Sequence, residues 1–319
     1  LTLFSGLLGF VVVALGAWTR LADAGLGCPD WPGCYGFATI PVNPEDIEIA
    51  NTRYPETPYE VAKAIPEMVH RYFAATLGLF IIGIFLAVNK KQENTKNLRT
   101  LSSFLVFWVI LQGVFGYLTV SLKLWPQVVT IHLLSGFVTT LIIWIIYFKA
   151  KDLGNSDAGH WSFNIKIKRL MSIGIVLVGL QIFLGAWTST NYASLSCSDF
   201  PLCQGQILPP ANFSEGFNFF QNVGPNYLGG LLDHESRVAI HLTHRLGALV
   251  VTVFLIYLIW SLYLEGLKRV PTVLAGVLVF QIGLGISNVI FGLPLLIAVA
   301  HNLGGLLLIT CLSVLRFRD

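Results

Sequence analysis

Four of the seven histidines are the residues best suited by type and position to do chemistry. Each lies in a different long apolar stretch, within roughly two helical turns of the end of that stretch. These histidines are His70, His132, His244 and His301. Ionisable residues are rare inside membrane spans and by default suggest function. A single one would most simply be a hydrogen-bonded helix contact, but four at similar depth predict ligands. His160 and His234 lie in loops and receive no role.

One histidine from each of two neighbouring helices at one depth is the arrangement that a haem iron with two axial imidazoles needs. The expected pairs are His70 with His132, and His244 with His301. Zinc would require a third or fourth nitrogen, oxygen or sulfur ligand. A proton carrier would more plausibly show carboxylates buried in the middle of its spans. The sequence therefore predicts two bis-histidine haem sites.

Charged residues beside the histidines add to this prediction. Arg71 and Arg245 directly follow His70 and His244 and are candidate partners for haem propionates, with snorkelling to the interface as the alternative. Glu67 stands three residues before His70, on the same helical face. It is the candidate acid–base or charge-stabilising group of a reacting haem, or else an interfacial carboxylate paired with the nearby arginine. His241 stands at the corresponding place before His244, and the sequence assigns it no role.

Two Cys-x5-Cys pairs lie in loops, Cys28 with Cys34 and Cys197 with Cys203. Neighbouring prolines and glycines favour tight turns, and the spacing does not match zinc or haem-attachment motifs. The sequence predicts two structural disulfides, and a redox-active dithiol remains the alternative. Cys311, inside the last apolar stretch, is expected to be an inert core thiol.

The elements that must position these residues are membrane spans. The chain has 319 residues, 55% of them apolar and 12% charged, and its mean hydropathy is +0.71. This composition disfavours a soluble globule, and a net charge of +3 disfavours a nucleic-acid binder. An aromatic content of 13% excludes disorder. The predicted fold is an all-α polytopic membrane protein. Its eight spans are expected near 1–20, 66–89, 100–120, 127–149, 169–190, 237–263, 270–291 and 294–315.

Basic residues predict the orientation of these spans. Lys and Arg gather after spans two, four and six and in the carboxy-terminal tail, from Lys90 and Lys91 to Arg316 and Arg318. Loop 21–65 instead carries seven acidic residues. By the positive-inside rule, both termini are cytoplasmic and the long loops 21–65 and 191–236 face outward. The histidine sites then lie toward the outer face of a plasma (inner) membrane.

An internal repeat divides the chain in two. Gly16-Ala17-Trp18-Thr19 recurs as Gly185-Ala186-Trp187-Thr188, and both cysteine pairs follow the same offset of 169 residues. His132 matches His301 at that offset as well. We expect two tandem pseudo-symmetric four-helix bundles, residues 1–155 with the substrate site and 156–319 with the cofactor site. A weaker Gln-x3-Gly pattern is interpreted as close helix packing, and its members are Gln112 and Gly116, Gln181 and Gly185, and Gln281 and Gly285.

Together these motifs resemble the haem A synthase family over nearly the whole chain. The resemblance rests on Gly16-Ala17-Trp18-Thr19-Arg20, Cys28-x5-Cys34, Glu67-x-x-His70-Arg71, His132, Cys197-x5-Cys203, His244-Arg245 and His301-Asn302-Leu303-Gly304-Gly305. It implies oxidation of the carbon 8 methyl of haem O to a formyl group, giving haem A for terminal oxidases. It implies substrate haem at His70 and His132, a catalytically important Glu67, and haem B at His244 and His301.

The resemblance also implies partners and a rival. A disulfide at Cys28 and Cys34 would matter for activity, and the cysteines place the chain in the Cys-bearing group of the family. The implied partners are haem O, a haem O synthase and an unidentified electron donor; the oligomeric state is open, a homo-oligomer included. The alternative function is a bis-histidine membrane cytochrome that only transfers electrons. A transporter, suggested by the duplication, would be colourless.

Overall fold

The computed structural model describes residues 1–90, 96–153 and 163–317. Within these ranges, eight helices are long and apolar enough to cross a membrane. They are α1 (Thr2–Leu21), α3 (Val61–Lys90), α4 (Lys96–Ser121), α5 (Pro126–Leu153), α6 (Ile165–Thr190), α8 (His234–Leu264), α9 (Arg269–Ile290) and α10 (Leu295–Phe317). The predicted all-α fold and its eight spans are confirmed, and the helix ends differ from the predicted ones by at most five residues.

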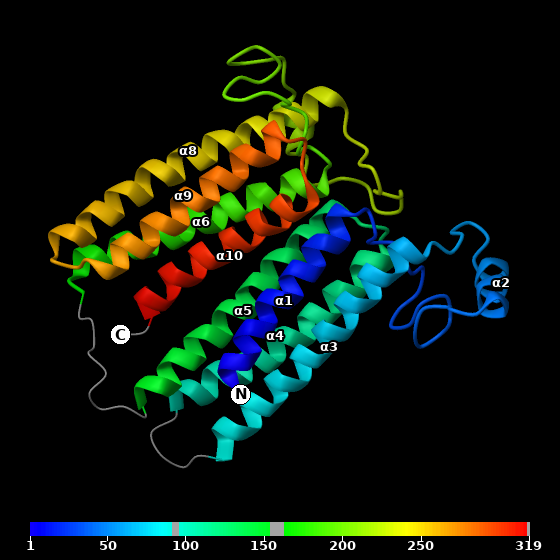
Figure 1. Ribbon diagram of the computed structural model, residues 1–319, viewed down its shortest axis with the longest axis horizontal. Coiled ribbons are helices and arrows are strands. Elements are labelled where there is room, and N and C mark those ends of the chain that lie inside the picture. Colours follow the sequence, from blue (N-terminus) through cyan, green and yellow to red (C-terminus); the bar gives the residue numbers. More distant parts are fainter. Residues whose placement is uncertain (91–95, 154–162, 318–319) are drawn as a thin grey trace.

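The spans run back and forth between two ends of the molecule. Figure 1 shows the long loops 22–60 and 191–233 together at one end and both termini at the other. The loop end also carries two short helices that the sequence did not predict, α2 (Pro44–Arg53) and α7 (Phe213–Gly216). The expected boundary between the halves, at residues 155 and 156, lies outside the described residues, as do His160, Lys91 and Arg318.

Both groups of four spans pack in the same pattern. In the first group, α1 and α4 each contact α3 and α5; in the second, α6 and α9 each contact α8 and α10. Each group has its own buried apolar cluster, around Ile81 and Ile143 in the first and around Met171 and Leu255 in the second. This arrangement agrees with the tandem repeat read from the sequence.

The two groups meet along α1, α5, α6 and α10. Polar contacts tie them together at the loop end. Arg20 donates a hydrogen bond to the Ser189 carbonyl at 2.5 Å, and its guanidinium lies 4.0 Å from the centre of the Tyr192 ring. The amide of Tyr227 donates to the Lys123 carbonyl at 3.0 Å, so the second long loop rests on the turn between α4 and α5.

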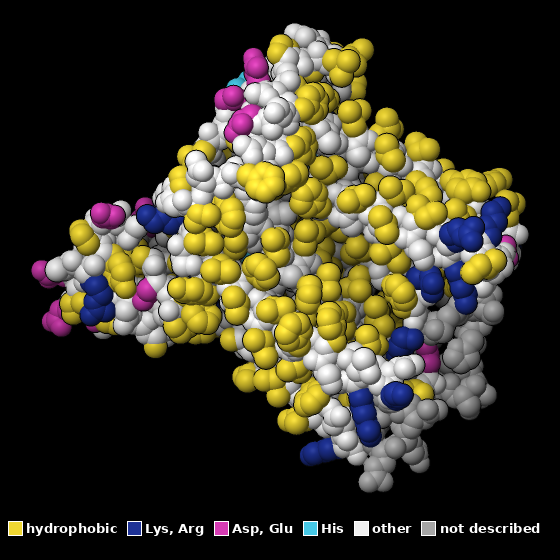
Figure 2. Space-filling view, turned by 180° about the vertical axis from the view of Figure 1, so that it is seen from behind, with side chains coloured by type: hydrophobic (Ala, Val, Ile, Leu, Met, Phe, Trp, Pro, Cys, Tyr) yellow, Lys and Arg dark blue, Asp and Glu magenta, His cyan; other side chains and the backbone are white. Residues whose placement is uncertain are grey.

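The surface separates apolar from charged side chains. Figure 2 shows a broad apolar band across the middle of the molecule, with basic side chains gathered at the end where the termini lie. Most of the acidic side chains in that view lie at the opposite end, on the long loops. An apolar band between two polar ends is the surface that a bilayer requires.

Candidate functional site

The first pair of predicted ligands is brought together inside the first group of helices. His70 on α3 and His132 on α5 have ring centres 6.5 Å apart, with the ring planes at 90°. Two metal–imidazole bonds of about 2 Å each, plus about 1 Å from each bonded nitrogen to its ring centre, predict a separation of roughly 6 Å. The separation therefore fits one metal ion between the two imidazoles.

The second pair occupies the same places in the second group. His244 lies on α8 and His301 on α10, the helices that correspond to α3 and α5. The two side chains are close enough to interact electrostatically. Among the described residues, no group of three or more His, Cys, Asp or Glu side chains could hold a metal ion. Paired imidazoles without a third protein ligand suit a haem iron, whose other ligands come from the porphyrin.

Neighbouring helices engage the other nitrogen of the imidazole at two of these histidines. Nδ1 of His70 is 3.1 Å from the Val12 carbonyl oxygen on α1. Nδ1 of His244 is 2.9 Å from the side-chain amide of Gln181 on α6. Metal-binding histidines characteristically donate the hydrogen of the second ring nitrogen to an acceptor such as the Val12 carbonyl, which leaves Nε2 of His70 for the metal.

A disulfide-closed loop covers the end of α3. Cys28 and Cys34 are bonded, as predicted, with Cα atoms 4.8 Å apart. Within the loop, the Asp30 carboxylate accepts hydrogen bonds from the amides of Tyr35 and Gly36 at 2.6 and 2.7 Å. Both cysteines are fully buried and belong to an apolar cluster with Ala64 and Met68 of α3.

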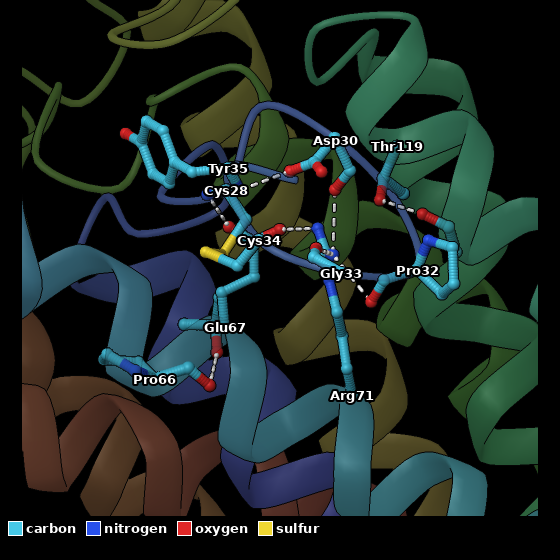
Figure 3. A network of polar contacts seen from close by, with 12 residues as sticks. Cys28, Asp30, Pro32, Gly33, Cys34, Tyr35, Pro66, Glu67, Arg71 and Thr119 are labelled. Atoms are coloured by element: carbon cyan, nitrogen blue, oxygen red, sulfur yellow. Dashed lines mark hydrogen bonds and ion pairs between the residues drawn. A yellow bond between two sulfur atoms is a disulfide. The ribbon is translucent and has the colours of Figure 1, made fainter. Parts of the chain in front are cut away.

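Glu67 and Arg71 join this loop to the histidine helix (Figure 3). One carboxylate oxygen of Glu67 pairs with the Arg71 guanidinium, and the other accepts the Cys28 amide hydrogen at 3.0 Å. Arg71 also donates to the carbonyls of Asp30 at 2.9 Å and Gly33 at 2.6 Å. Glu67 is only 4% exposed, so it is a buried, paired carboxylate one turn from His70.

The second group repeats this network with one exchange. Cys197 and Cys203 are bonded, as predicted, and His241 replaces the carboxylate. Nδ1 of His241 lies 3.2 Å from the Cys197 amide nitrogen and Nε2 lies 3.3 Å from Nε of Arg245, and a neutral imidazole accepts a hydrogen bond at one of these two nitrogens. Arg245 also donates to the carbonyls of Leu202 at 2.8 Å and Cys197 at 2.7 Å. His241 is 4% exposed, the same as Glu67.

Both arginines proposed for haem propionates are thus engaged by the disulfide loops. The role of the arginines in holding the loops could not be predicted from the sequence, because backbone carbonyl acceptors have no sequence signature. His241 also received no role, although it stands three residues before His244 just as Glu67 stands three residues before His70. Cys311 is a free, half-buried thiol on α10, as expected.

Electrostatics outside the spans also differ between the loops. Burial, followed by the negative charges of Glu60 and Glu67, raises the pKa of Tyr35 in the first loop to about 12. In the second loop, hydrogen bonds from the backbone amides of Gly205 and Gln204 lower the pKa of Asp199. The first loop therefore disfavours added negative charge near Glu67.

The fold and the paired histidines define a polytopic membrane protein with two similar paired-histidine sites. The model of the cytochrome oxidase assembly protein family, COX15-CtaA, matches residues 1–313. The chain belongs to this family. A protein from Shewanella oneidensis, "Heme A synthase", is 39% identical over 308 residues, covering 96% of this chain and 92% of its own.

More distant relatives carry the same printed name. "Heme A synthase" of Wolbachia pipientis subsp. Culex pipiens is 27% identical, covering 96% of this chain and 93% of its own. "Heme A synthase" of Nitrosomonas eutropha is 29% identical, covering 94% of this chain and 87% of its own. Each match extends over both groups of helices, so both histidine pairs lie within the region of similarity.

Proposed function

We propose that this chain is a haem A synthase, an oxidoreductase that converts the carbon 8 methyl group of haem O to a formyl group. The observation that carries the proposal is a match to relatives of that name over almost the entire chain, combined with two histidine pairs in one fold. A one-site electron carrier would need no second, altered copy of the site.

The substrate site is assigned to the first group of helices, with His70 and His132 as ligands of the haem O iron. Conversion of a methyl to a formyl group removes four electrons and four protons when the oxygen comes from water. A proton acceptor near the porphyrin edge is therefore useful, and Glu67 lies one turn from His70. Its carboxylate oxygens retain lone pairs beyond those used by Arg71 and the Cys28 amide.

The comparison with His241 supports a chemical role for Glu67. In the second half, His241 stands at the equivalent place and contacts the equivalent loop amide, of Cys197, and the equivalent arginine, Arg245. Holding the loop therefore does not require a carboxylate. The additional property that Glu67 brings is a negative charge beside the substrate.

The second group of helices is assigned a resident haem B, held by His244 and His301. When bound, this haem supplies one-electron transfer. The chain's own contribution is to keep both imidazoles in place, with Gln181 at Nδ1 of His244. Haem O would come from a haem O synthase, and the electron partner and any homo-oligomer stay open.

We also propose that both termini face the cytoplasm, with the haem sites toward the outer face of the inner membrane. The basic side chains at the terminal end and the acidic loops at the other support this orientation. The disulfide loops beside both sites agree with it, because disulfides persist outside the reducing cytoplasm.

The test is conversion of haem O in cells that make haem O and express this chain. Extracted pigments should contain haem A. Glu67→Gln should reduce the conversion by on the order of 10²–10⁴-fold, the usual contribution of a positioned acid–base group. The variant should keep the low-spin haem B spectrum of the second half, and hydroxymethyl haem should accumulate if the second oxidation is slowed more.

His241→Gln is the matched control, because it alters the equivalent contact in the half that holds no substrate. It should leave haem A formation close to the parental rate. Haem A formation at the parental rate in Glu67→Gln would show that Glu67 is only a paired interfacial carboxylate. Haem in the parental protein without any haem A would favour the electron-transfer cytochrome instead, and a colourless protein would favour the transporter.

A further inference from the structure

A glycine of a neighbouring helix faces each of the four ligand histidines. The pairs are Gly16 with His70, Gly116 with His132, Gly185 with His244, and Gly285 with His301. Each glycine comes from the helix that precedes the histidine helix among the spans: α1, α4, α6 and α9. The contact occurs at both histidines of each half, which makes it a systematic feature of the fold.

All four histidines present the same ring atom to their glycine. A Cβ atom would lie 2.9 Å from Cε1 of His70 at Gly16, and 3.0 Å from Cε1 of His301 at Gly285. The distances are 3.1 Å for His244 and 3.4 Å for His132. Carbon atoms in ordinary contact are about 3.5–4.0 Å apart. A methyl group would therefore clash with the ring edge of His70, crowd the rings of His301 and His244, and lie at the short limit of ordinary contact with His132.

Cε1 lies between the two ring nitrogens, so contact at this atom controls how the imidazole is turned. On α1 and α6, the same helix also engages Nδ1, four residues before the glycine. Val12 does so with its carbonyl at His70, and Gln181 with its side-chain amide at His244. On α4, Gln112 donates instead to the His132 carbonyl at 2.9 Å. At His70 and His244, the preceding helix thus contacts the imidazole from two directions, at Cε1 and at Nδ1.

We infer that Gly16, Gly116, Gly185 and Gly285 are positioning residues that set the ring orientation of the four iron-ligand histidines. The inference rests on the proposed function for the nature of the metal group. It gives the Gln-x3-Gly pattern a specific purpose beyond close helix packing. Other glycines of the same helices do not share it, because a Cβ at Gly113, Gly179 or Gly283 would meet nothing within 4 Å.

The test replaces glycines of the second half by alanine and measures the spectrum and midpoint potential of its haem in purified protein. Gly185→Ala and Gly285→Ala should lose at least about half of the low-spin signal or shift the midpoint potential, because ligand misplacement by an ångström has large effects. Gly179→Ala and Gly283→Ala are matched controls on the same helices. They should keep the parental spectrum, since alanine is ordinarily favoured over glycine in a helix.

The outcomes separate this inference from the proposed function. A parental protein without low-spin haem contradicts the proposed function, whatever the glycine variants do. A parental low-spin spectrum that stays unchanged in both Gly185→Ala and Gly285→Ala overturns the inference alone. In the first half, Gly116→Ala should reduce haem A formation less than Gly16→Ala, because its contact is longest.

A variant that does not accumulate is also informative. The three atoms nearest to a Cβ at Gly185 all belong to the His244 ring. In a His244→Gly background the added methyl therefore has room, and the double variant should accumulate like His244→Gly alone. An equal loss in that background would show that Gly185 acts on folding independently of the histidine, and the inference would fail.

Discussion

The two halves of the molecule contain nearly the same network of polar contacts, built around a different residue in each half. In the first, a buried carboxylate joins the histidine helix, an arginine and a disulfide loop; in the second, a buried imidazole does so. Glu67 and His241 are equally buried, and each contacts the amide of the first cysteine of its loop. The scaffold is therefore independent of the charge at this position. Under the proposed function, the chemistry belongs to the half that carries the negative charge of Glu67.

The largest expected effect comes from removing the ligands of one half at a time. His244→Ala and His301→Ala should each abolish the low-spin haem B spectrum of the purified protein. His70→Ala and His132→Ala should preserve that spectrum and abolish haem A formation. Optical spectra and pigment extraction measure both properties. Loss of the same haem signal in all four variants would contradict the division of labour between the halves.

An exchange of the differing residues sharpens the comparison. Glu67→His gives the first half the network of the second, so the loop should stay in place while conversion falls by on the order of 10²–10⁴-fold. Disulfide mapping and the yield of purified protein check that the loop is retained. His241→Glu, the reciprocal change, should leave conversion near the parental rate. Full activity in Glu67→His would show that the negative charge of Glu67 is not needed for the conversion.

Removal of the disulfides should have a smaller, unequal effect. Cys28 donates its amide hydrogen to Glu67, so Cys28→Ser with Cys34→Ser should displace the carboxylate and slow conversion by on the order of 10²-fold. Cys197→Ser with Cys203→Ser alters the contact of His241 and should change conversion little. Rates of haem A formation under identical expression compare the two variants. Equal losses would mean that both disulfides act only by stabilising the loops.

Sequence reasoning predicted the features that depend on composition and spacing. Long apolar stretches predicted the eight spans. A constant offset of 169 residues paired Cys28 with Cys197 and His132 with His301. Both disulfides followed from local turn-forming residues and a short separation. Each of these features depends either on neighbouring residues in the chain or on a pattern that the two halves repeat.

The contacts that complete the sites could not be predicted in this way. Arg71 and Arg245 bind loop carbonyls, and every residue type offers the same carbonyl. The contact between Gly16 and His70 joins residues 54 positions apart, and it depends on the rotation of α1 against α3. Helix α2 lies in a polar loop without the apolar periodicity that identifies a packed helix. Tertiary packing settles all three.

The smallest expected effect concerns the pH dependence of the two loops. Tyr35 donates a hydrogen bond to the Pro58 carbonyl at 3.2 Å, and its pKa in the folded loop is about 12 instead of 10. The folded loop therefore holds this proton more tightly than the unfolded chain does. The resulting stabilisation is complete below pH 10 and is lost as the pH rises toward 12. The corresponding residue of the second loop is Gln204, which does not titrate.

This difference predicts that only the first loop loosens in strong alkali. The rate at which a reductant opens Cys28–Cys34, divided by the rate for Cys197–Cys203, should rise between pH 10 and 12. The rise should stay below the roughly hundredfold change that a pKa raised from 10 to about 12 corresponds to. Taking the ratio cancels the general increase in reductant reactivity with pH. Tyr35→Phe removes the titrating group and should make the ratio flat; an unchanged rise in that variant would assign the loosening to another group.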